Sequence, residues 1–199
     1  MKKYRTIYAD PPWKEKGWNK GGKENPQLRG ANRHYELMDT KQICDLPVSN
    51  IADENSHLYL WVTNNFLLDG IEVIKAWGFT YKTMITWSKI TGFEQFGLPT
   101  IQMGLGQYFR GATEHCLFAV KGNLPYKIIN GKRQQGITLI IESRTKHSKK
   151  PKQMREMIET VSYEPRIELF ARQKTEGWDV WGNEVESDIE YPSLEGFIP

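Results

Sequence analysis

The sequence predicts an α/β domain with a largely parallel sheet, and three observations support this fold class. Short β-branched and aromatic runs alternate along the chain with segments whose apolar residues recur every three or four positions. Prolines and glycines separate these segments. A chain of 199 residues, 39% hydrophobic and 26% charged, can bury the core that such a domain needs.

Six strands are predicted from apolar runs that turn residues interrupt. The first is expected to end at Asp10-Pro11-Pro12, because two consecutive prolines remove two backbone donors from any continuing strand. Residues 90–111 are glycine-rich, so we expect a connection there. In chain order, the predicted strands cover residues 4–9, 57–63, 79–87, 114–120, 137–141 and 167–171.

Three helices are predicted between these strands. The first is short, with Thr40 as its cap and an end before Pro47. The second begins at Asn64 or Asn65 and has Gly78 just past its end, where glycine commonly terminates a helix. Pro151 suits the first position of the third. The apolar faces contain Leu67, Ile71 and Ile74 in the second helix, and Met154, Met157, Ile158 and Val161 in the third.

Composition excludes several protein classes. Cys44 and Cys116 are too few for a disulfide framework or a cysteine-rich zinc site, so we expect no metal and a reducing, cytoplasmic setting. No stretch has the length of a signal peptide core or a membrane span. No repeat or linker divides the chain. We expect one domain over residues 1–185 and an acidic, solvated tail over residues 186–199.

Two loops, over residues 14–33 and 143–152, are rich in lysine and arginine. The net charge of the chain is only +3, because acidic residues elsewhere, including those of the tail, offset these basic loops. Each follows a predicted strand, so both are expected to flank one site and to contact phosphates. The alternative is that these lysines and arginines form solvated surface. The residues expected to meet a nucleic acid are Lys20, Lys23, Arg29, Arg33, Lys146 and Lys149.

The most informative motif is Asp10-Pro11-Pro12-Trp13, directly after the first strand. Ligands of open α/β sheets bind beyond the carboxyl ends of strands. The Asp10 carboxylate and the rigidly held Pro11 carbonyl could accept the two N–H groups of an amine on a planar ring, and Trp13 could stack on that ring. The alternative is a turn that ends the strand, with Trp13 in the core.

This motif resembles the DPPW signature of the methyltransferase-A-seventy family, whose members are S-adenosylmethionine-dependent adenine-N6 methyltransferases. The resemblance covers residues 4 to 185 in the same order. It implies a permuted, Rossmann-like methyltransferase fold in which the catalytic strand comes first and the cofactor strand near the end. Besides the tetrad, the segments that carry it are His57–Thr63, Glu114–Leu117 with Val120–Gly122, Arg144 with His147–Pro151, Glu168–Arg172, Gly177-Trp178 and Trp181–Glu184.

The resemblance also implies functional residues. It makes Asp10, Pro11, Pro12 and Trp13 the catalytic tetrad, with Trp13 also contacting the substrate. Glu114 is implied on the target side. One departure is Lys152, at a position where the family usually has an acidic residue. The implied S-adenosylmethionine contacts are Lys150 for the methionine carboxylate, Glu168, Phe170 and Arg172 at a strand end, and Asn183 and Glu184 for the ribose.

Together these features predict methyl transfer from S-adenosylmethionine to the exocyclic N6 amine of adenine in a nucleic acid. A base within a duplex would have to flip out. We favour DNA and a small bacterial or phage enzyme, with RNA as the alternative polymer. The competing class is a nucleic-acid-binding member of the same fold that does not transfer methyl groups. The motifs leave the oligomeric state open.

Overall fold

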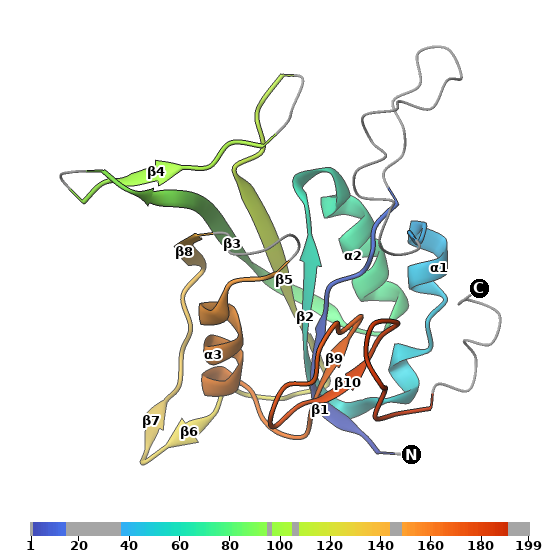
Figure 1. Cartoon of the computed structure of the whole chain (residues 1–199). Coiled ribbons are helices and arrows are strands. Elements are labelled where there is room, and N and C mark those ends of the chain that lie inside the picture. The colour runs from blue at the N-terminus through green and yellow to red at the C-terminus, as the bar shows by residue number, and fades with distance from the viewer. Residues whose placement is uncertain (1, 15–36, 95–96, 105–107, 144–148, 191–199) are drawn as a thin grey trace, which may run out of the picture.

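The computed structural model describes residues 2–14, 37–94, 97–104, 108–143 and 149–190. Its main sheet has eight strands in the order β10-β9-β1-β2-β5-β3-β4, with β8 paired to β3 (Figure 1). A separate ribbon consists of β6 (Ile128–Ile129) and β7 (Lys132–Arg133). The main-sheet strands are β1 (Tyr4–Ala9), β2 (Ala52–Val62), β3 (Thr80–Phe93), β4 (Pro99–Ile101), β5 (Thr113–Lys121), β8 (Leu139–Ser143), β9 (Arg166–Leu169) and β10 (Asp179–Trp181).

The direction of the strands confirms the predicted fold class. β1 runs parallel to β2 and β9, β10 runs parallel to β9, and β8 runs parallel to β3. β5 lies antiparallel between β2 and β3. The amino end of β5 therefore lies at the same edge of the sheet as the carboxyl ends of its neighbours. This edge is called the catalytic edge below.

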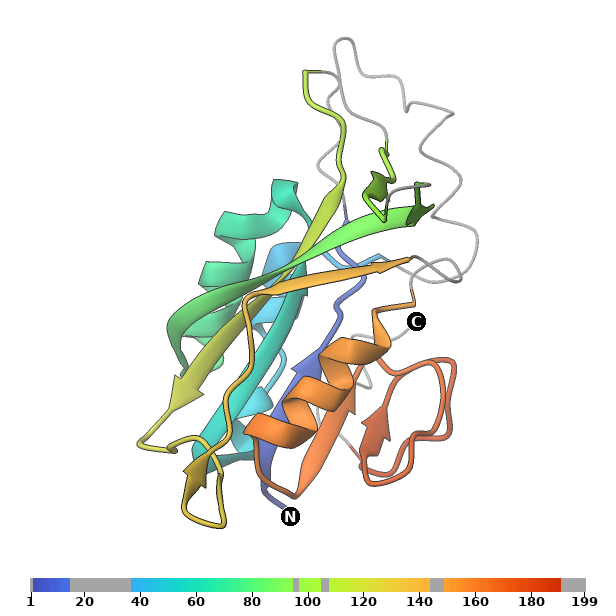
Figure 2. The same ribbon diagram turned by 90° about the vertical axis from the view of Figure 1, so that its left-hand side faces the viewer.

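Helices cover both faces of the sheet, as the two views show (Figures 1 and 2). α1 (Thr40–Cys44) and α2 (Leu67–Ala76) pack on the face that contains Ile7 and Leu58. α3 (Lys152–Val161) packs on the opposite face, which contains Tyr8 and Trp61. Neighbouring residues of β1 and β2 thus enter opposite cores, because successive side chains of a strand point to opposite faces. Single-turn helices η2 (Val48–Asn50) and η3 (Asn64–Phe66) precede β2 and α2.

Helix ends differ in detail from the sequence prediction. Asp39, not Thr40, caps α1, because its side chain accepts the backbone N–H of Gln42 and the Gln42 side chain accepts the backbone N–H of Asp39. Pro151 is the residue before α3 rather than its first helical residue. Gly78 follows α2 at φ +81°, a conformation that glycine adopts without strain.

The expectation of an irregular connection over residues 90–111 was wrong in part. β3 continues to Phe93 and pairs with β4, so the chain forms a two-stranded arm beyond the sheet (Figure 1). The backbone of Lys89 anchors this arm: its N–H donates to Ala112 O at 2.9 Å and its carbonyl accepts from Gln102 N at 2.9 Å. β10 and the β6–β7 ribbon were not predicted, because strands of two or three residues show no periodicity.

The beginning of the acidic tail packs against the domain. Asp188 pairs with Lys174, and its carboxylate accepts the backbone N–H of Val180 in β10 at 2.9 Å. Ile189 packs against the core that α1 and α2 cover. Asp188 and Ile189 therefore contact β10 and the core, and the expected boundary at residue 186 stays a prediction.

Candidate active site

Three charged side chains meet at the catalytic edge. Asp10 follows β1, Glu114 lies near the amino end of β5, and Lys150 precedes α3. The Lys150 ammonium lies 2.9 Å from Asp10 Oδ1 and 3.0 Å from Glu114 Oε2. It also stands over the Trp61 ring, 5.1 Å from the ring centroid. The sequence resemblance named all three residues, and the structure brings them together.

A fourth charge completes this group, which we call the charged cluster (Asp10, Glu114, Lys150 and Lys89). Lys89 of β3 lies 2.5 Å from Glu114 Oε1. Sequence reasoning missed Lys89. The signal was Glu114 itself, because a carboxylate within an apolar strand requires a cation or a position at the site. The structure provides both, and the four side chains form a chain of alternating charge across β1, β5 and β3.

The pKa values in the cluster follow from burial and from these contacts. Burial raises the pKa of Asp10 above its usual value, although Lys150 opposes the shift. Burial would also raise the pKa of Glu114, but Lys150 and Lys89 outweigh it and lower that pKa. Burial acts against the charge of Lys150, yet Asp10 and Glu114 raise its pKa. Lys150 and Glu114 therefore remain charged, and Asp10 is the easier carboxylate to protonate.

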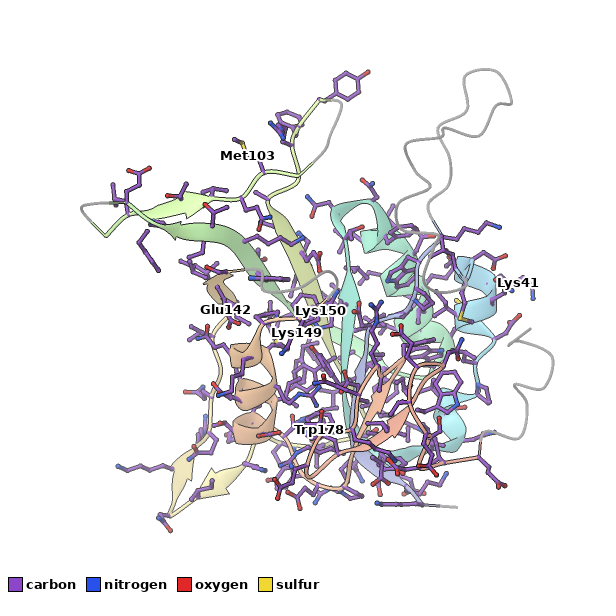
Figure 3. All side chains as sticks on the ribbon, viewed as in Figure 1. Lys41, Met103, Glu142, Lys149, Lys150 and Trp178 are labelled. Carbon is purple, nitrogen blue, oxygen red and sulfur yellow. The ribbon has the colours of Figure 1, made fainter. Side chains whose placement is uncertain are left out.

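The start of α3 holds Lys150 in place (Figure 3). Glu142 of β8 accepts the backbone N–H of Lys152 at 2.9 Å and that of Gln153 at 3.2 Å. Its carboxylate thus occupies the N-terminal end of the helix, where free N–H groups attract negative charge. The Glu142 carbonyl accepts Trp87 Nε1 at 2.8 Å. Two free N–H groups at the start of α3 are therefore already paired with Glu142.

The tetrad is held by backbone bonds on both sides. The Pro11 carbonyl accepts the Trp13 N–H at 2.9 Å, and the Pro12 carbonyl accepts the Met38 N–H at 2.8 Å. Trp13 stacks on Phe66 with ring centroids 5.2 Å apart, and its Nε1 donates to the Trp61 carbonyl at 3.0 Å. One face of the Trp13 ring is consequently covered by Phe66.

Glu168 lies beside the site but has a partner within the protein. Its carboxylate pairs with Arg155 of α3, and the Arg155 guanidinium lies over the Tyr8 and Trp178 rings at 5.5 and 4.8 Å. Burial raises the pKa of Glu168, and Arg155 opposes this. One nitrogen of Arg155, Nη1, is buried without a hydrogen-bond partner among the described residues.

The turns after β9 and β10 lie against each other. Phe170 has φ +62°, an unfavourable conformation for a residue with a side chain, and packs edge-on against Trp181. The Ala171 N–H donates to Trp181 O at 2.9 Å. A Cβ on Gly182 would lie 2.1 Å from the Ala171 carbonyl oxygen, so this close approach requires glycine.

These two turns bring the remaining predicted cofactor residues to the catalytic edge. Asn183 and Glu184 follow β10 and are exposed. Arg172 lies 3.5 Å from Glu184, and its positive charge reaches Asp10, whose pKa it lowers. Because β10, β9 and β1 are neighbours and parallel, all three strands end at the same edge, and the segments that follow them begin there.

Other predicted residues are not placed in the site. Lys149 is exposed beside Lys150 (Figure 3). Within the described ranges no group of three metal-binding side chains occurs, and no helix is long and apolar enough to span a membrane. The predicted phosphate contacts at Lys20, Lys23, Arg29, Arg33 and Lys146 lie outside the described residues.

Comparison with known proteins decides the family. The family model MT-A70, for methyltransferase-A-seventy, matches residues 4–184. The chain belongs to the MT-A70 family. The type II methyltransferase M.MunI from a Mycoplasma species is 32% identical over 96% of this chain and 82% of its own length. The human N(6)-adenosine-methyltransferase catalytic subunit METTL3 is 29% identical over 92% of this chain but 28% of its own length. The Arabidopsis thaliana N6-adenosine-methyltransferase non-catalytic subunit MTB is 30% identical over 61% of this chain and 15% of its own length.

Family membership confirms the predicted enzyme class and cofactor: the chain is an adenine-N6 methyltransferase that uses S-adenosylmethionine. The residues present fit this ligand. Lys150 carries three donors, two of which go to Asp10 and Glu114, so one can meet a carboxylate. The exposed amide of Asn183 and carboxylate of Glu184 suit ribose hydroxyls.

Proposed function

We propose that the charged cluster is the catalytic centre of a DNA adenine-N6 methyltransferase. The observation that carries this proposal is the position of Asp10. Its Oδ1 is bound to Lys150, whereas no donor among the described residues reaches Oδ2. An acceptor is thus held rigidly at the end of β1, next to the Pro11 carbonyl, and both can face an amine.

In this mechanism the chain supplies acceptors and orientation. S-adenosylmethionine, when bound, supplies the electrophilic methyl group. Asp10 Oδ2 accepts one N–H of the target amine, and the Pro11 carbonyl, which has a second lone pair, accepts the other. These bonds favour the tetrahedral nitrogen that the reaction requires over the planar one of the free base. The extra proton of the methylated nitrogen would pass to Asp10 Oδ2 and then to water, while the methyl donor would leave as a neutral thioether. The face of Trp13 opposite Phe66 stacks on the adenine.

The remaining residues position the two ligands. Lys150 fixes the Asp10 carboxylate and directs its third donor to the methionine carboxylate of the cofactor. Asn183 and Glu184 bind the ribose. The turns at Phe170 and Gly182 keep these contacts beside Asp10, and the basic loops are proposed to bind phosphates as the base enters.

Two features favour DNA over RNA. A type II methyltransferase from a Mycoplasma species matches over most of both lengths. The relatives named for N6-adenosine, a ribonucleoside, are matched over 28% of their length or less. We accordingly place the protein in the cytoplasm of a bacterium or phage-infected cell.

Transfer of labelled methyl groups to matched DNA and RNA oligonucleotides tests this proposal. We expect N6-methyladenine in DNA with the wild-type protein and none with Asp10→Asn, which keeps the shape of the side chain but not its charge. Mapping of methylated adenines in an expressing host identifies the target sequence. Preferential labelling of RNA would reverse the choice of polymer. Cofactor binding without methylation of either polymer would instead favour the non-catalytic class to which the relative MTB belongs.

A further inference from the structure

Lys89 has a contact that the proposed mechanism does not use. Its ammonium lies 2.5 Å from Glu114 Oε1, while Lys150 holds the other oxygen of the same carboxylate at 3.0 Å. The Lys89 and Glu114 side chains are each 18% exposed, and the Lys89 ammonium lies 5.3 Å from the Trp87 ring centroid. This pair is shielded from solvent well beyond an ordinary surface ion pair, so its geometry matters energetically.

Charge balance shows what Lys89 contributes. With Lys89, the cluster contains two ammonium and two carboxylate groups and is neutral. Without it, Asp10 and Glu114 would share Lys150 alone. Glu114 would then compete for Lys150, and the contact between Lys150 and Asp10 would weaken. An unbalanced carboxylate in a shielded site also takes up a proton more readily.

Both backbone hydrogen-bonding groups of Lys89 are paired. Hydrogen bonds to Ala112 and Gln102 join it to both chain segments that flank the arm. The ammonium is therefore presented to Glu114 from a rigid support, as a positioning role requires.

We propose that Lys89 is a positioning residue for methyl transfer, which acts through Glu114 to keep Lys150 on Asp10. It touches neither substrate nor cofactor. Lys89 holds one oxygen of Glu114, so the other oxygen engages Lys150 in a single contact and leaves the ammonium available to Asp10. This inference rests on the proposed function, because it assigns Asp10 the role of acceptor.

Lys89→Met and Lys89→Arg test the proposal, with Lys82→Met as the matched control. Lys82 lies on the same strand and is exposed, so its loss changes the overall charge equally without touching the cluster. We expect Lys89→Met to lower kcat roughly ten- to hundredfold, as expected when a reacting group shifts by about 1 Å, with KM for both ligands little changed. Lys89→Arg should restore most of kcat, and Lys82→Met should equal the wild type.

A second readout does not depend on activity. The aspartate carboxyls are labelled with ¹³C, and the Asp10 signal is assigned by its loss in Asp10→Asn. An NMR titration then follows the protonation of Asp10 in the absence of both ligands. In Lys89→Met the coupled carboxylates should take up their proton at higher pH, by about one unit. Lys82→Met, which removes an equal charge outside the cluster, should not produce this shift.

The outcomes separate the two proposals. An inactive wild-type protein contradicts the proposed function, whereas the titration still reports on Lys89. An active wild type whose Lys89→Met variant keeps both kcat and the Asp10 titration overturns the positioning role. Another outcome is that Lys89→Met loses activity because its melting temperature is lower, while the Asp10 titration stays unchanged. That outcome also overturns the positioning role.

Discussion

Two groups of polar side chains lie at the two ends of α3, and they differ in charge and in burial. At its N-terminal end is the charged cluster. At its C-terminal end is the neutral cluster (Tyr59, Ser162, His57 and the Leu124 carbonyl). Both lie on the same face of the sheet, yet the side chains of Asp10 and Lys150 are 26% and 17% exposed, whereas His57 and Ser162 are 2% and 0% exposed.

The neutral cluster is a closed chain of hydrogen bonds. His57 Nε2 lies 3.0 Å from the Leu124 carbonyl, so this nitrogen carries the proton. His57 Nδ1 therefore accepts from Ser162 Oγ at 2.8 Å, and Ser162 accepts from the Tyr59 hydroxyl at 2.7 Å. Burial lowers the pKa of His57 and raises that of Tyr59, which keeps both uncharged.

The difference shows how one fold separates stability from chemistry. In the neutral cluster each described donor meets an acceptor inside the protein, so it can join β2 to the end of α3 but offers a ligand nothing. The charged cluster keeps one Asp10 oxygen and one Lys150 donor for other molecules. Variants of the charged cluster should therefore change activity, and variants of the neutral cluster should change stability.

The largest expected effect is that of Asp10→Ala. Removal of a preorganised acceptor should lower the rate of methyl transfer on the order of hundredfold or more. Burial disfavours the charged form of this carboxylate, so the free energy of unfolding at neutral pH should not fall comparably. Single-turnover kinetics and urea unfolding of the same preparation measure both effects. Near-normal methyl transfer would show that Asp10 is not the acceptor.

Asn183→Ala should reduce cofactor affinity and leave the rate at saturation unchanged, whereas Lys150→Ala should reduce both, because Lys150 also holds Asp10. A lost charge-assisted hydrogen bond corresponds to roughly 1.5–3 kcal/mol, or about ten- to hundredfold in Kd. Lys150→Ala should also raise the pKa of Asp10, because Lys150 is the main group that lowers it. On acidification, the activity of this variant should therefore fall at a higher pH than that of the wild type. Calorimetric titration of S-adenosylmethionine measures the affinities. Unchanged Kd in both variants would remove the proposed cofactor contacts.

The sequence predicts a residue of this site only where a local pattern or the family resemblance marks that residue. Asp10 is marked by a strand followed by two prolines, and Glu114 was named by the family resemblance. Lys150 was found through the family resemblance. Lys89 and Glu142 were missed because their roles depend on which strands become neighbours, and the sequence order of β3, β5 and β8 does not reveal that β5 and β8 both pair with β3.

The fold shows the same limit. The spacing of apolar residues located most long strands and the helices. The residues at which the strands end depend on how the strands pair with one another. β3 continues through Gly92 because β4 returns alongside it, which no local pattern indicates. The neutral cluster joins residues more than 100 positions apart, and His57 has no motif that distinguishes it from an exposed histidine.

Ser162→Ala should break the neutral cluster and leave chemistry intact. The substitution leaves His57 Nδ1 and the Tyr59 hydroxyl buried without a partner, which costs about 1–3 kcal/mol. The free energy of unfolding should fall by that amount, while kcat per folded molecule stays at the wild-type value. Ser49→Ala is a suitable control, because Ser49 is an exposed serine outside the cluster. A large loss of kcat with unchanged stability would contradict the division between the two ends of α3.

The smallest expected effect is the pH dependence that His57 gives to stability. Burial lowers the pKa of His57 in the folded protein below its usual value of 6.5, at which the unfolded chain takes up a proton. The contribution to stability is therefore complete above about pH 6.5 and is lost as the pH falls from there towards the folded pKa. Between pH 7.5 and 5.5 the wild-type protein should lose about 1 kcal/mol more of its free energy of unfolding than His57→Gln, which cannot titrate. Other groups titrate equally in both proteins, so the difference between the two urea-unfolding series isolates His57. Parallel series would mean that the folded protein accepts the proton, and that the neutral cluster is open to water in the way we ascribe to the charged one.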